Sequence, residues 1–413
     1  MNNYKYGNKK VYHPRWLADK IRDVLNVNPV IILTGARQTG KSTLITNEVP
    51  FSSWRYLSFD DLDVLGMAKR SPQTLLSVKK NTVIDEVQKA PEVLTAIKYI
   101  IDKDRKRRFI ISGSANLLLM KRVTETLAGR SSYFMLLPFS LKEWHEEKPN
   151  LVFKLFKGYL PKEKRFKAVS PLKYIFQGFL PPVLRLDKTD QIATWWEGYV
   201  KTYLERDLRD LTAVSSLSDF KRIMEICAIK SGSILNEMDI ARSCGMSQST
   251  VHRYINLLEA SHLYIRLRPF TKSKIRRIIK SPKGYFLDPG LATYLAGFRS
   301  PDEIPPDLVG YLFETLILLH LQIYATLLSG NVYYWRTWGG KEKEVDFILE
   351  ANQKLIAVEV KLGQKVSYND IQHLQFFIDN NKNNVVAGIV AYTGDELTYL
   401  TKNIFALPWT AFC

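Results

Sequence analysis

The sequence predicts an α/β protein of several compact domains, and three features of the chain lead to this prediction. From residue 30 to about residue 138, short apolar runs alternate with longer stretches of helical spacing, a rhythm typical of a parallel sheet covered by helices. From residue 139 to residue 298 the pattern becomes mainly helical and charged, and it ends in a basic stretch. The remainder mixes one long apolar helix with strands that carry acidic residues. A chain of 413 residues is long enough for two to four domains with separate cores.

The chain is strongly basic, with 59 Lys and Arg against 41 Asp and Glu and a formal net charge of +18. Such an excess raises the local concentration of polyanions and speeds encounter with them. Nucleic acid, and DNA in particular, is therefore the leading candidate partner, and an anionic membrane surface is the second. Charge alone does not separate the two.

Cysteine usage and the apolar segments indicate a cytoplasmic protein without a membrane span. The three cysteines lie far apart and show no metal-ligand spacing, which favours a reducing compartment. The first residues, MNNYKYGNKKVYHPRW, lack the apolar core of a signal peptide. The most apolar stretch, 311–328, is interrupted by Glu314, His320 and Gln322. Because a membrane span needs about 20 mainly apolar residues, we expect a buried helix here.

A phosphate-binding loop follows the first apolar strand. The stretch GARQTGKST, residues 35–43, has the glycine spacing that lets backbone N–H groups turn inward around phosphates. Lys41 is expected to reach the terminal phosphates, and the Ser42 hydroxyl is expected to bind Mg²⁺. A helix that begins near Lys41 would present its positive end to the phosphates. The predicted ATP-binding residues are Gly35, Ala36, Arg37, Gln38, Thr39, Gly40, Lys41, Ser42 and Thr43.

The second half of the nucleotide site is expected at the ends of two later strands. In NTVIDEVQ, Asp85 would hold Mg²⁺, and Glu86 would polarise the attacking water. In FIISGSANLLL, the strand leads into Ser112 and Ser114, and we expect Ser114 to sense the γ-phosphate with Asn116 behind it, although a helix cap explains Ser114 equally well. Arg130 precedes the next strand, where it either reaches a neighbouring subunit's nucleotide or forms a surface salt bridge.

These motifs, together with LAGRSSYFMLLPFSLKEW, QGFLPPV and YVKTYLERDLRDL, resemble the AAA-type ATPases that are fused to a C-terminal domain of unknown function. The resemblance covers nearly the whole chain, and Gln177 and Pro182 depart from the usual pattern. It implies a homo-oligomer, a ring that is expected to be a hexamer, with nucleotide at the subunit interfaces. It also favours Arg130 as the arginine finger, with Arg206 as a second interfacial arginine.

The segment from Ile234 to Tyr264 has the pattern of a helix-turn-helix, with Gly245 in the turn and an apolar inner face on the second helix. The basic stretch that follows would form a wing, and each phosphate that it neutralises would release counterions. Because winged helices also bind proteins, that alternative stays open. The residues expected to face DNA are Gln248, Ser249, His252, Arg253, Lys272, Lys274, Arg276, Arg277, Lys280 and Lys283.

The last domain carries acids in the PD-(D/E)XK nuclease pattern. Glu359 and Lys361 are two apart in a strand and therefore point to the same face, and Asp346 would join them from the adjacent strand. Glu314 is a suitable fourth acid on the preceding helix. The carboxylates can hold a metal ion, and the lysine can position or activate water. Retained cleavage and a role in binding alone are equally compatible with this pattern.

The predicted architecture is thus a P-loop AAA+ parallel sheet with a helical lid, a winged helix-turn-helix, and a C-terminal restriction-endonuclease-like α/β domain. The corresponding ranges are 1–145 for the ATPase core, 146–215 for the lid and connecting segment, 216–298 for the winged helix and 299–413 for the nuclease-like domain. We expect an Mg²⁺-dependent ATPase that acts on DNA as a motor or switch. The alternatives are an ATP-regulated nuclease and a signalling or chaperone-like ATPase that binds proteins.

Overall fold

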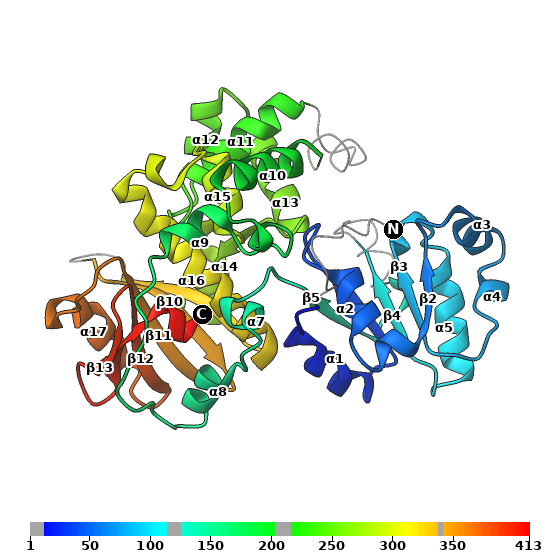
Figure 1. Cartoon of the computed structure of the whole chain (residues 1–413), viewed down its shortest axis with the longest axis horizontal. Coiled ribbons are helices and arrows are strands. Elements are labelled where there is room, and N and C mark those ends of the chain that lie inside the picture. The colour runs from blue at the N-terminus through cyan, green and yellow to red at the C-terminus, as the bar shows by residue number, and fades with distance from the viewer. Residues whose placement is uncertain (1–11, 114–124, 203–215, 338–341) are drawn as a thin grey trace. The chain divides into compact units, whose positions relative to one another are not determined.

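The computed structural model describes residues 12–113, 125–202, 216–337 and 342–413 (Figure 1). The chain divides into two compact units, Met1–Lys148 and Pro149–Cys413. The first unit ends close to residue 145, where the sequence predicts the end of the ATPase core. The three later predicted domains lie within the second unit.

The first unit is built on a parallel five-stranded sheet in the order β2-β3-β4-β1-β5. Strands occupy the short apolar runs between residues 30 and 112, which confirms an α/β domain with a parallel sheet. Because β4 lies between β1 and β3, the carboxyl ends of these three strands meet at one edge of the sheet. The strands are β1 (Val30–Thr34), β2 (Arg55–Ser58), β3 (Thr82–Asp85), β4 (Phe109–Ser112) and β5 (Ser131–Met135).

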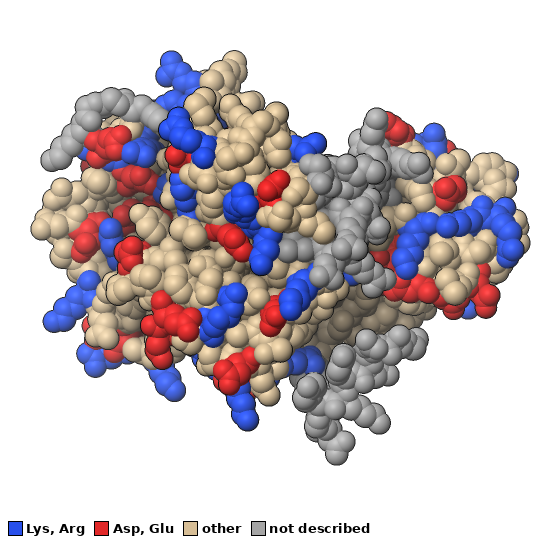
Figure 2. All heavy atoms as spheres, turned by 90° about the horizontal axis from the view of Figure 1, so that it is seen from above, with Lys and Arg blue, Asp and Glu red and all other residues tan. Residues whose placement is uncertain are grey.

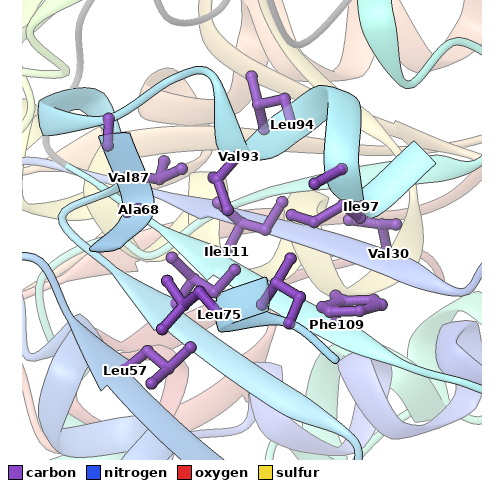
Figure 3. Packing of buried hydrophobic residues seen from close by; sticks show 14 of the residues in the cluster. Val30, Leu57, Ala68, Leu75, Val87, Val93, Leu94, Ile97, Phe109 and Ile111 are labelled. Carbon is purple, nitrogen blue, oxygen red and sulfur yellow. The ribbon is translucent and has the colours of Figure 1, made fainter. Parts of the chain in front are cut away.

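Helices cover both faces of this sheet, and the residues of β1 alternate between two cores. Val30 and Ile32 pack with Phe109 and Ile111 against one group of helices (Figure 3). Ile31 and its neighbours on the same face pack against the other group. This arrangement explains why the central strands are apolar without a break. The helices of the unit are α1 (Leu17–Leu25), α2 (Lys41–Asn47), α3 (Leu62–Arg70), α4 (Pro72–Leu75), α5 (Val93–Lys103) and α7 (Leu141–Trp144).

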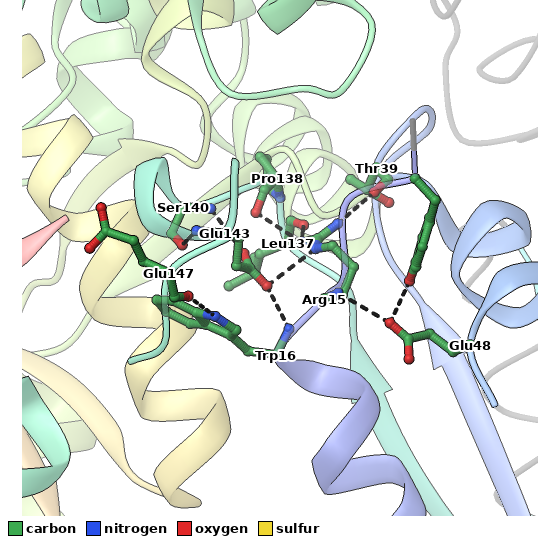
Figure 4. Close-up of polar contacts among 10 residues, drawn as sticks. Arg15, Trp16, Thr39, Glu48, Leu137, Pro138, Ser140, Glu143 and Glu147 are labelled. Atoms are coloured by element: carbon green, nitrogen blue, oxygen red, sulfur yellow. Dashed lines mark hydrogen bonds and ion pairs between the residues drawn. The ribbon is translucent and has the colours of Figure 1, made fainter. Parts of the chain in front are cut away.

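A buried arginine from the segment before α1 ties three parts of the first unit together (Figure 4). Arg15 is 5% exposed, and its guanidinium donates to the Thr39 carbonyl oxygen in the glycine-rich loop at 2.9 Å and to the Leu137 carbonyl oxygen at 2.7 Å. Its charge is balanced by Glu143, whose Oε1 lies 3.3 Å from Arg15 Nε. Glu143 also caps α7 through a reciprocal capping box with Ser140.

The second unit contains a mixed seven-stranded sheet in the order β6-β13-β14-β12-β11-β10-β9. β11, β12 and β14 run parallel, whereas β9, β10 and β11 form an antiparallel meander. The strands are β6 (Lys164–Arg165), β9 (Asn331–Arg336), β10 (Glu344–Ala351), β11 (Lys354–Lys361), β12 (Val385–Tyr392), β13 (Glu396–Tyr399) and β14 (Ile404–Pro408). The helices of this part are α16 (Pro306–Leu328), α17 (Gln372–Asn380) and α18 (Trp409–Phe412).

Helix α16 is long and apolar enough to cross a membrane, but 67% of its most apolar window is buried within the protein. His320 lies inside this packing, where its ring contacts Phe179 edge to face. The contacts of α16 with β9, β10 and β11 fit a buried core helix, as the interrupted apolar run predicts.

The segment predicted as a lid belongs to the second unit. β6 pairs with β13 of the mixed sheet, and α9 packs against α15. Asp288 joins these layers because its buried carboxylate accepts a hydrogen bond from the Phe179 backbone N–H at 2.9 Å. The helices of the lid segment are α8 (Asn150–Phe156), α9 (Leu172–Gln177) and α10 (Thr189–Thr202).

The predicted DNA-binding segment consists of three helices followed by a two-stranded antiparallel sheet. Gly245 ends the second of these helices in a left-handed conformation, which a glycine adopts readily. The basic stretch is not a plain hairpin, because a short helix interrupts it between the two strands. The elements are α11 (Leu217–Ile229), α12 (Glu237–Cys244), α13 (Gln248–Ala260), β7 (Tyr264–Leu267), α14 (Lys274–Ile279), β8 (Lys283–Phe286) and α15 (Pro289–Leu295).

Replacing Arg15 tests its anchoring role. We expect Arg15→Met to lower the local opening free energy of the first unit by roughly 3–5 kcal/mol, because it leaves the Glu143 carboxylate buried without its partner. Hydrogen–deuterium exchange of peptides that cover β1 and the glycine-rich loop measures this change. The exposed Lys89–Asp60 ion pair provides the control. Lys89→Met should cost less than about 1 kcal/mol, and equal protection in both variants would contradict the anchoring role.

Candidate functional site

The loop between β1 and α2 is shaped by its backbone. Gly35 has a φ of 147° and Gly40 has a φ of 92°, both in the region that favours glycine. A Cβ at Gly35 would lie 2.4 Å from the Leu136 carbonyl oxygen, so no larger residue fits without displacing backbone. Gln38 also has a positive φ, at 62°, which completes a tight loop that ends at the first turn of α2.

Lys41 lies at the start of α2 and is 8% exposed. Its Nζ donates to the carbonyl oxygens of Gly35 at 3.0 Å and Ala36 at 2.9 Å, so the side chain folds back over the loop. Thr39 is buried and donates its hydroxyl to the Ala36 carbonyl oxygen at 3.0 Å. Arg37 is partly buried, whereas Gln38, Ser42 and Thr43 are exposed.

The carboxylate of Asp85, at the end of β3, accepts hydrogen bonds from three hydroxyl groups. Ser42 Oγ on α2 and Tyr56 Oη on β2 each donate to Oδ2 at 2.7 Å, and Ser112 Oγ at the end of β4 donates to Oδ1. Asp85 is only 4% exposed. The strand order therefore brings together two residues that the sequence predicts as magnesium ligands, Ser42 and Asp85.

Glu86 follows Asp85 in a left-handed backbone conformation, with a φ of 57° and a ψ of 40°. Such a conformation costs a non-glycine residue of order 1–3 kcal/mol and is concentrated at functional sites. Burial raises the pKa of the Glu86 carboxyl, and the nearby Asp85 carboxylate raises it further. The Gln88 side-chain amide donates to Glu86 Oε2. A half-buried carboxyl with a raised pKa is suited to act as a general base.

Two contributors to this site were not predicted from the sequence. Tyr56 lies on a neighbouring strand and reaches Asp85 only because β2 pairs with β3, with Ser58 opposite Asp85. Arg15 precedes the loop by 20 residues, and nothing in its sequence surroundings marks it. Their roles depend on strand order and loop contacts, which no local motif encodes.

Contacts within the described part of the chain do not connect the other predicted residues of the nucleotide site to the glycine-rich loop. Arg130 Nε lies 2.7 Å from Asp102 Oδ1, in the surface ion pair that was the alternative to an arginine finger. Ser114, Asn116 and Arg206 lie outside the described residues.

The residues of α13 predicted to face DNA are exposed at its start. Gln248 and Ser249 occupy the first turn, and His252 and Arg253 follow one turn later. His252 Nδ1 lies 2.9 Å from Glu237 Oε2 on α12. An acidic neighbour of this kind reduces the positive potential that this face can offer to phosphates.

The basic stretch after β7 requires a correction. Arg277 was expected to face DNA, but its Nη1 lies 2.8 Å from Glu350 Oε2 of β10, and its guanidinium stacks 4.6 Å from the Phe270 and Tyr333 ring centres. Lys283 was also expected on this surface, but it is 6% exposed and pairs with Glu344 of β10. These cations fasten the two-stranded sheet to the mixed sheet of the same unit.

The remaining basic residues of this stretch stand beside an apolar surface. Lys272 and Arg276 are exposed, and Lys280 is partly buried. The side chain of Lys274 lies outside the described part of the structure. Three isoleucines of α14 are exposed by 68% to 77%, which is unusual for a surface that serves only to bind phosphates. They are Ile275, Ile278 and Ile279.

The acids of the predicted nuclease pattern lie on neighbouring elements of the second unit. Asp346 on β10 accepts the Val360 backbone N–H of β11 at 2.7 Å. On β11, Lys361 Nζ lies 3.1 Å from Glu359 Oε1. Glu314 on α16 accepts the Tyr285 hydroxyl of β8 at 3.1 Å. We refer to Glu314, Glu344, Asp346 and Glu359 as the acid cluster.

Burial is the main electrostatic influence on the acid cluster. It raises the pKa of Glu314, Asp346 and Glu359, and mutual repulsion among these carboxylates adds to the effect for Glu314 and Glu359. Burial alone would lower the pKa of Lys283, but Glu314, Glu344 and Asp346 outweigh it, so the pKa is raised. Among the described residues, no group of three or more His, Cys, Asp or Glu is arranged to hold a metal ion.

Three family models match separate parts of the chain. Residues 27–145 match an AAA domain, residues 171–302 match Domain of unknown function (DUF8612), and residues 309–412 match Domain of unknown function (DUF4143). The AAA match covers the parallel sheet and the glycine-rich loop. The predicted ATPase-like α/β domain is therefore supported by both the match and the strand arrangement.

Full-length relatives also align with most of the chain. The Uncharacterized protein Rv2008c of Mycobacterium tuberculosis is 29% identical over 350 residues, which cover 83% of this chain and 73% of that protein. The Uncharacterized protein MJ1544 of Methanocaldococcus jannaschii is 24% identical over 397 residues, which cover 91% and 84% respectively. Among solved structures, the Walker-type ATPase PABY2304 of Pyrococcus abyssi aligns with 69% of this chain and 96% of its own, at 15% identity and a TM-score of 0.46. In its first unit, this chain is similar to AAA domains.

Proposed function

We propose that the protein is an Mg²⁺-dependent ATPase whose second unit engages DNA, so that ATP turnover drives or licenses an event on DNA. The observation that supports the ATPase most strongly is the contact between Ser42 and Asp85, at 2.7 Å. It joins the glycine-rich loop to the acidic strand end, which are the two halves that a P-loop nucleotide site requires.

The residues present fit an Mg²⁺–ATP complex. The backbone N–H groups of the loop and the amino end of α2 would receive the phosphates. Lys41 Nζ now bonds to two loop carbonyls, and a triphosphate offers it stronger, charge-assisted partners. Ser42 and Asp85 supply oxygen ligands of the kind that Mg²⁺ prefers, and the bound ion would neutralise charge on the phosphates. Glu86 would orient water and accept its proton.

Further parts of the catalytic machinery would come from an oligomer. Arg130 is a third exposed, and its partner Asp102 is nearly half exposed, so the ion pair between them is weak enough to exchange. We propose that a ring of subunits, a hexamer in the simplest case, directs Arg130 to a neighbouring nucleotide. Ser114, which lies outside the described residues, would sense the γ-phosphate as the sequence predicts.

DNA contact would use the start of α13 together with the segment around α14. The order of the three helices and the two-stranded sheet supports the proposed winged helix-turn-helix, and the acids of the mixed sheet support the proposed nuclease-like domain. Figure 2 shows Lys and Arg spread among Asp and Glu on the face that it presents. The proposed binding rests on local contacts at α13 and α14, and the net charge of +18 would speed the encounter.

The three exposed isoleucines of α14 favour a second candidate, in which this segment binds a protein partner and the ATPase acts as a signalling or chaperone-like switch. ATP turnover with single-stranded, duplex and branched DNA separates the two candidates. Stimulation by any of these DNAs, absent in Lys41→Ala, supports the DNA function. Equal rates with and without DNA support the protein-binding candidate.

Glu86 tests the hydrolytic step. We expect Glu86→Gln to keep ATP binding but to lower the turnover number by roughly 10²–10⁴, because the amide cannot accept a proton from water. Steady-state phosphate release and titration with a fluorescent ATP analogue measure the two quantities. Glu92→Gln, an exposed acid nearby in the chain, should leave both unchanged. Normal turnover in Glu86→Gln would exclude Glu86 as the base.

Salt dependence tests the DNA contact. The exposed Lys272 and Arg276 should each neutralise about one phosphate, so the double variant Lys272→Ala/Arg276→Ala should reduce the slope of log K against log salt by about 2. Fluorescence anisotropy of a labelled duplex at several salt concentrations measures the slope. A double variant at the exposed Lys188 and Lys365 is the control. An unchanged slope in the Lys272/Arg276 variant would show that α14 does not contact DNA.

A further inference from the structure

The acid cluster of the second unit contains a lysine that belongs to a different part of the chain. Lys283 opens β8, whereas the acids lie on α16, β10 and β11. Its side chain is 7% exposed and its ammonium pairs with Glu344. Glu314, Glu344 and Asp346 outweigh the effect of burial and raise the pKa of Lys283.

A second residue of β8 completes this insertion. The Tyr285 hydroxyl donates to Glu314 Oε2 at 3.1 Å, and Tyr285 is fully buried. Gly232 lies beside Glu314, because a Cβ on Gly232 would be 3.6 Å from Glu314 Oε2. The same Cβ would be 3.2 Å from the Tyr311 side chain. β8 thus reaches the acids with one cation and one hydroxyl donor.

The charges of this region do not balance. If ionised, the carboxylates of Glu314, Glu344, Asp346 and Glu359 carry four negative charges, against one positive charge each on Lys283 and Lys361. Arg336 approaches Glu344 but is paired more closely with Glu342. A deficit of about two positive charges in a buried site favours either bound protons or a divalent cation.

One carboxylate oxygen of the acid cluster has no hydrogen-bond partner among the described residues. Glu359 is 8% exposed, and its Oε2 is buried without a hydrogen-bond partner within the described part of the chain. A buried carboxylate oxygen without a partner is costly, and such oxygens are normally satisfied by a donor, a water or a cation. Its other oxygen, Oε1, is held by Lys361 at 3.1 Å.

We propose that Lys283 is a built-in competitor of a divalent cation: with its buried ammonium paired to Glu344, the acid cluster as folded excludes metal. This inference does not depend on nucleotide binding or on DNA.

The test uses Tb³⁺, whose luminescence is sensitised by nearby tyrosine and which binds oxygen ligands as Ca²⁺ does. The full chain is titrated without nucleotide, as wild type, Lys283→Met, and Lys283→Met/Glu359→Gln. We expect Lys283→Met to bind one more ion per chain than wild type, with affinity at this site higher by roughly tenfold or more, because a like charge has been removed from the site. The added Glu359→Gln change should abolish that ion.

Two further variants keep the test decisive. Lys188→Met removes an exposed lysine of the same unit and should match wild type. Lys283→Gln keeps a hydrogen-bond donor for Glu344, so it replaces Lys283→Met if circular dichroism shows that the methionine variant is unfolded. A folded Lys283 variant that binds no additional Tb³⁺, or a wild-type signal that is equally strong and equally dependent on Glu359, overturns the proposal. Because ATP is absent, neither result reflects a failure of the ATPase.

Discussion

The hydrogen bonds to the Asp85 carboxylate determine the form of the first unit's site. This group is buried at the end of a strand, where an isolated charge would be unstable, and three hydroxyls from three different elements converge on it. That convergence requires β4 to lie between β1 and β3, and it requires α2 to begin directly after the glycine-rich loop. Arg15 supports the opposite side of the loop by bonding to Thr39. The loop is therefore held from both sides before any nucleotide arrives.

The acids of the second unit also require compensating partners, but these partners are of a different kind. These acids are buried or partly buried, and they are compensated mainly by Lys283 and Lys361 rather than by hydroxyl groups. Arg277 forms a parallel link to Glu350 on the same strand that carries Glu344 and Asp346. Cations that the sequence assigns to DNA thus serve to join two layers of one unit.

Local motifs predicted the parts of the protein whose chemistry is encoded in short stretches. The glycine-rich loop, the strand before Asp85 and the convergence of Glu359 and Lys361 on one strand face all follow from spacing within a few residues. Tyr56, Arg15 and Lys283 could not be predicted, because each acts on a partner that is distant in the sequence and brought near by strand order or layer packing. The basic stretch shows this limit most clearly. The sequence alone does not show which lysine and arginine side chains of a charged run are buried and which are exposed, because packing against other elements decides it.

The central claim is that the loop and Asp85 form one Mg²⁺-dependent ATP site. Calorimetric titration of ATP into the purified full chain tests it directly, with Mg²⁺ or with a chelator, for wild type and for Asp85→Asn. We predict one ATP per chain, an affinity at least roughly tenfold lower without Mg²⁺, and loss of this magnesium dependence in Asp85→Asn. Absence of ATP binding by the wild-type protein in Mg²⁺, or an unchanged magnesium dependence in Asp85→Asn, would contradict the account.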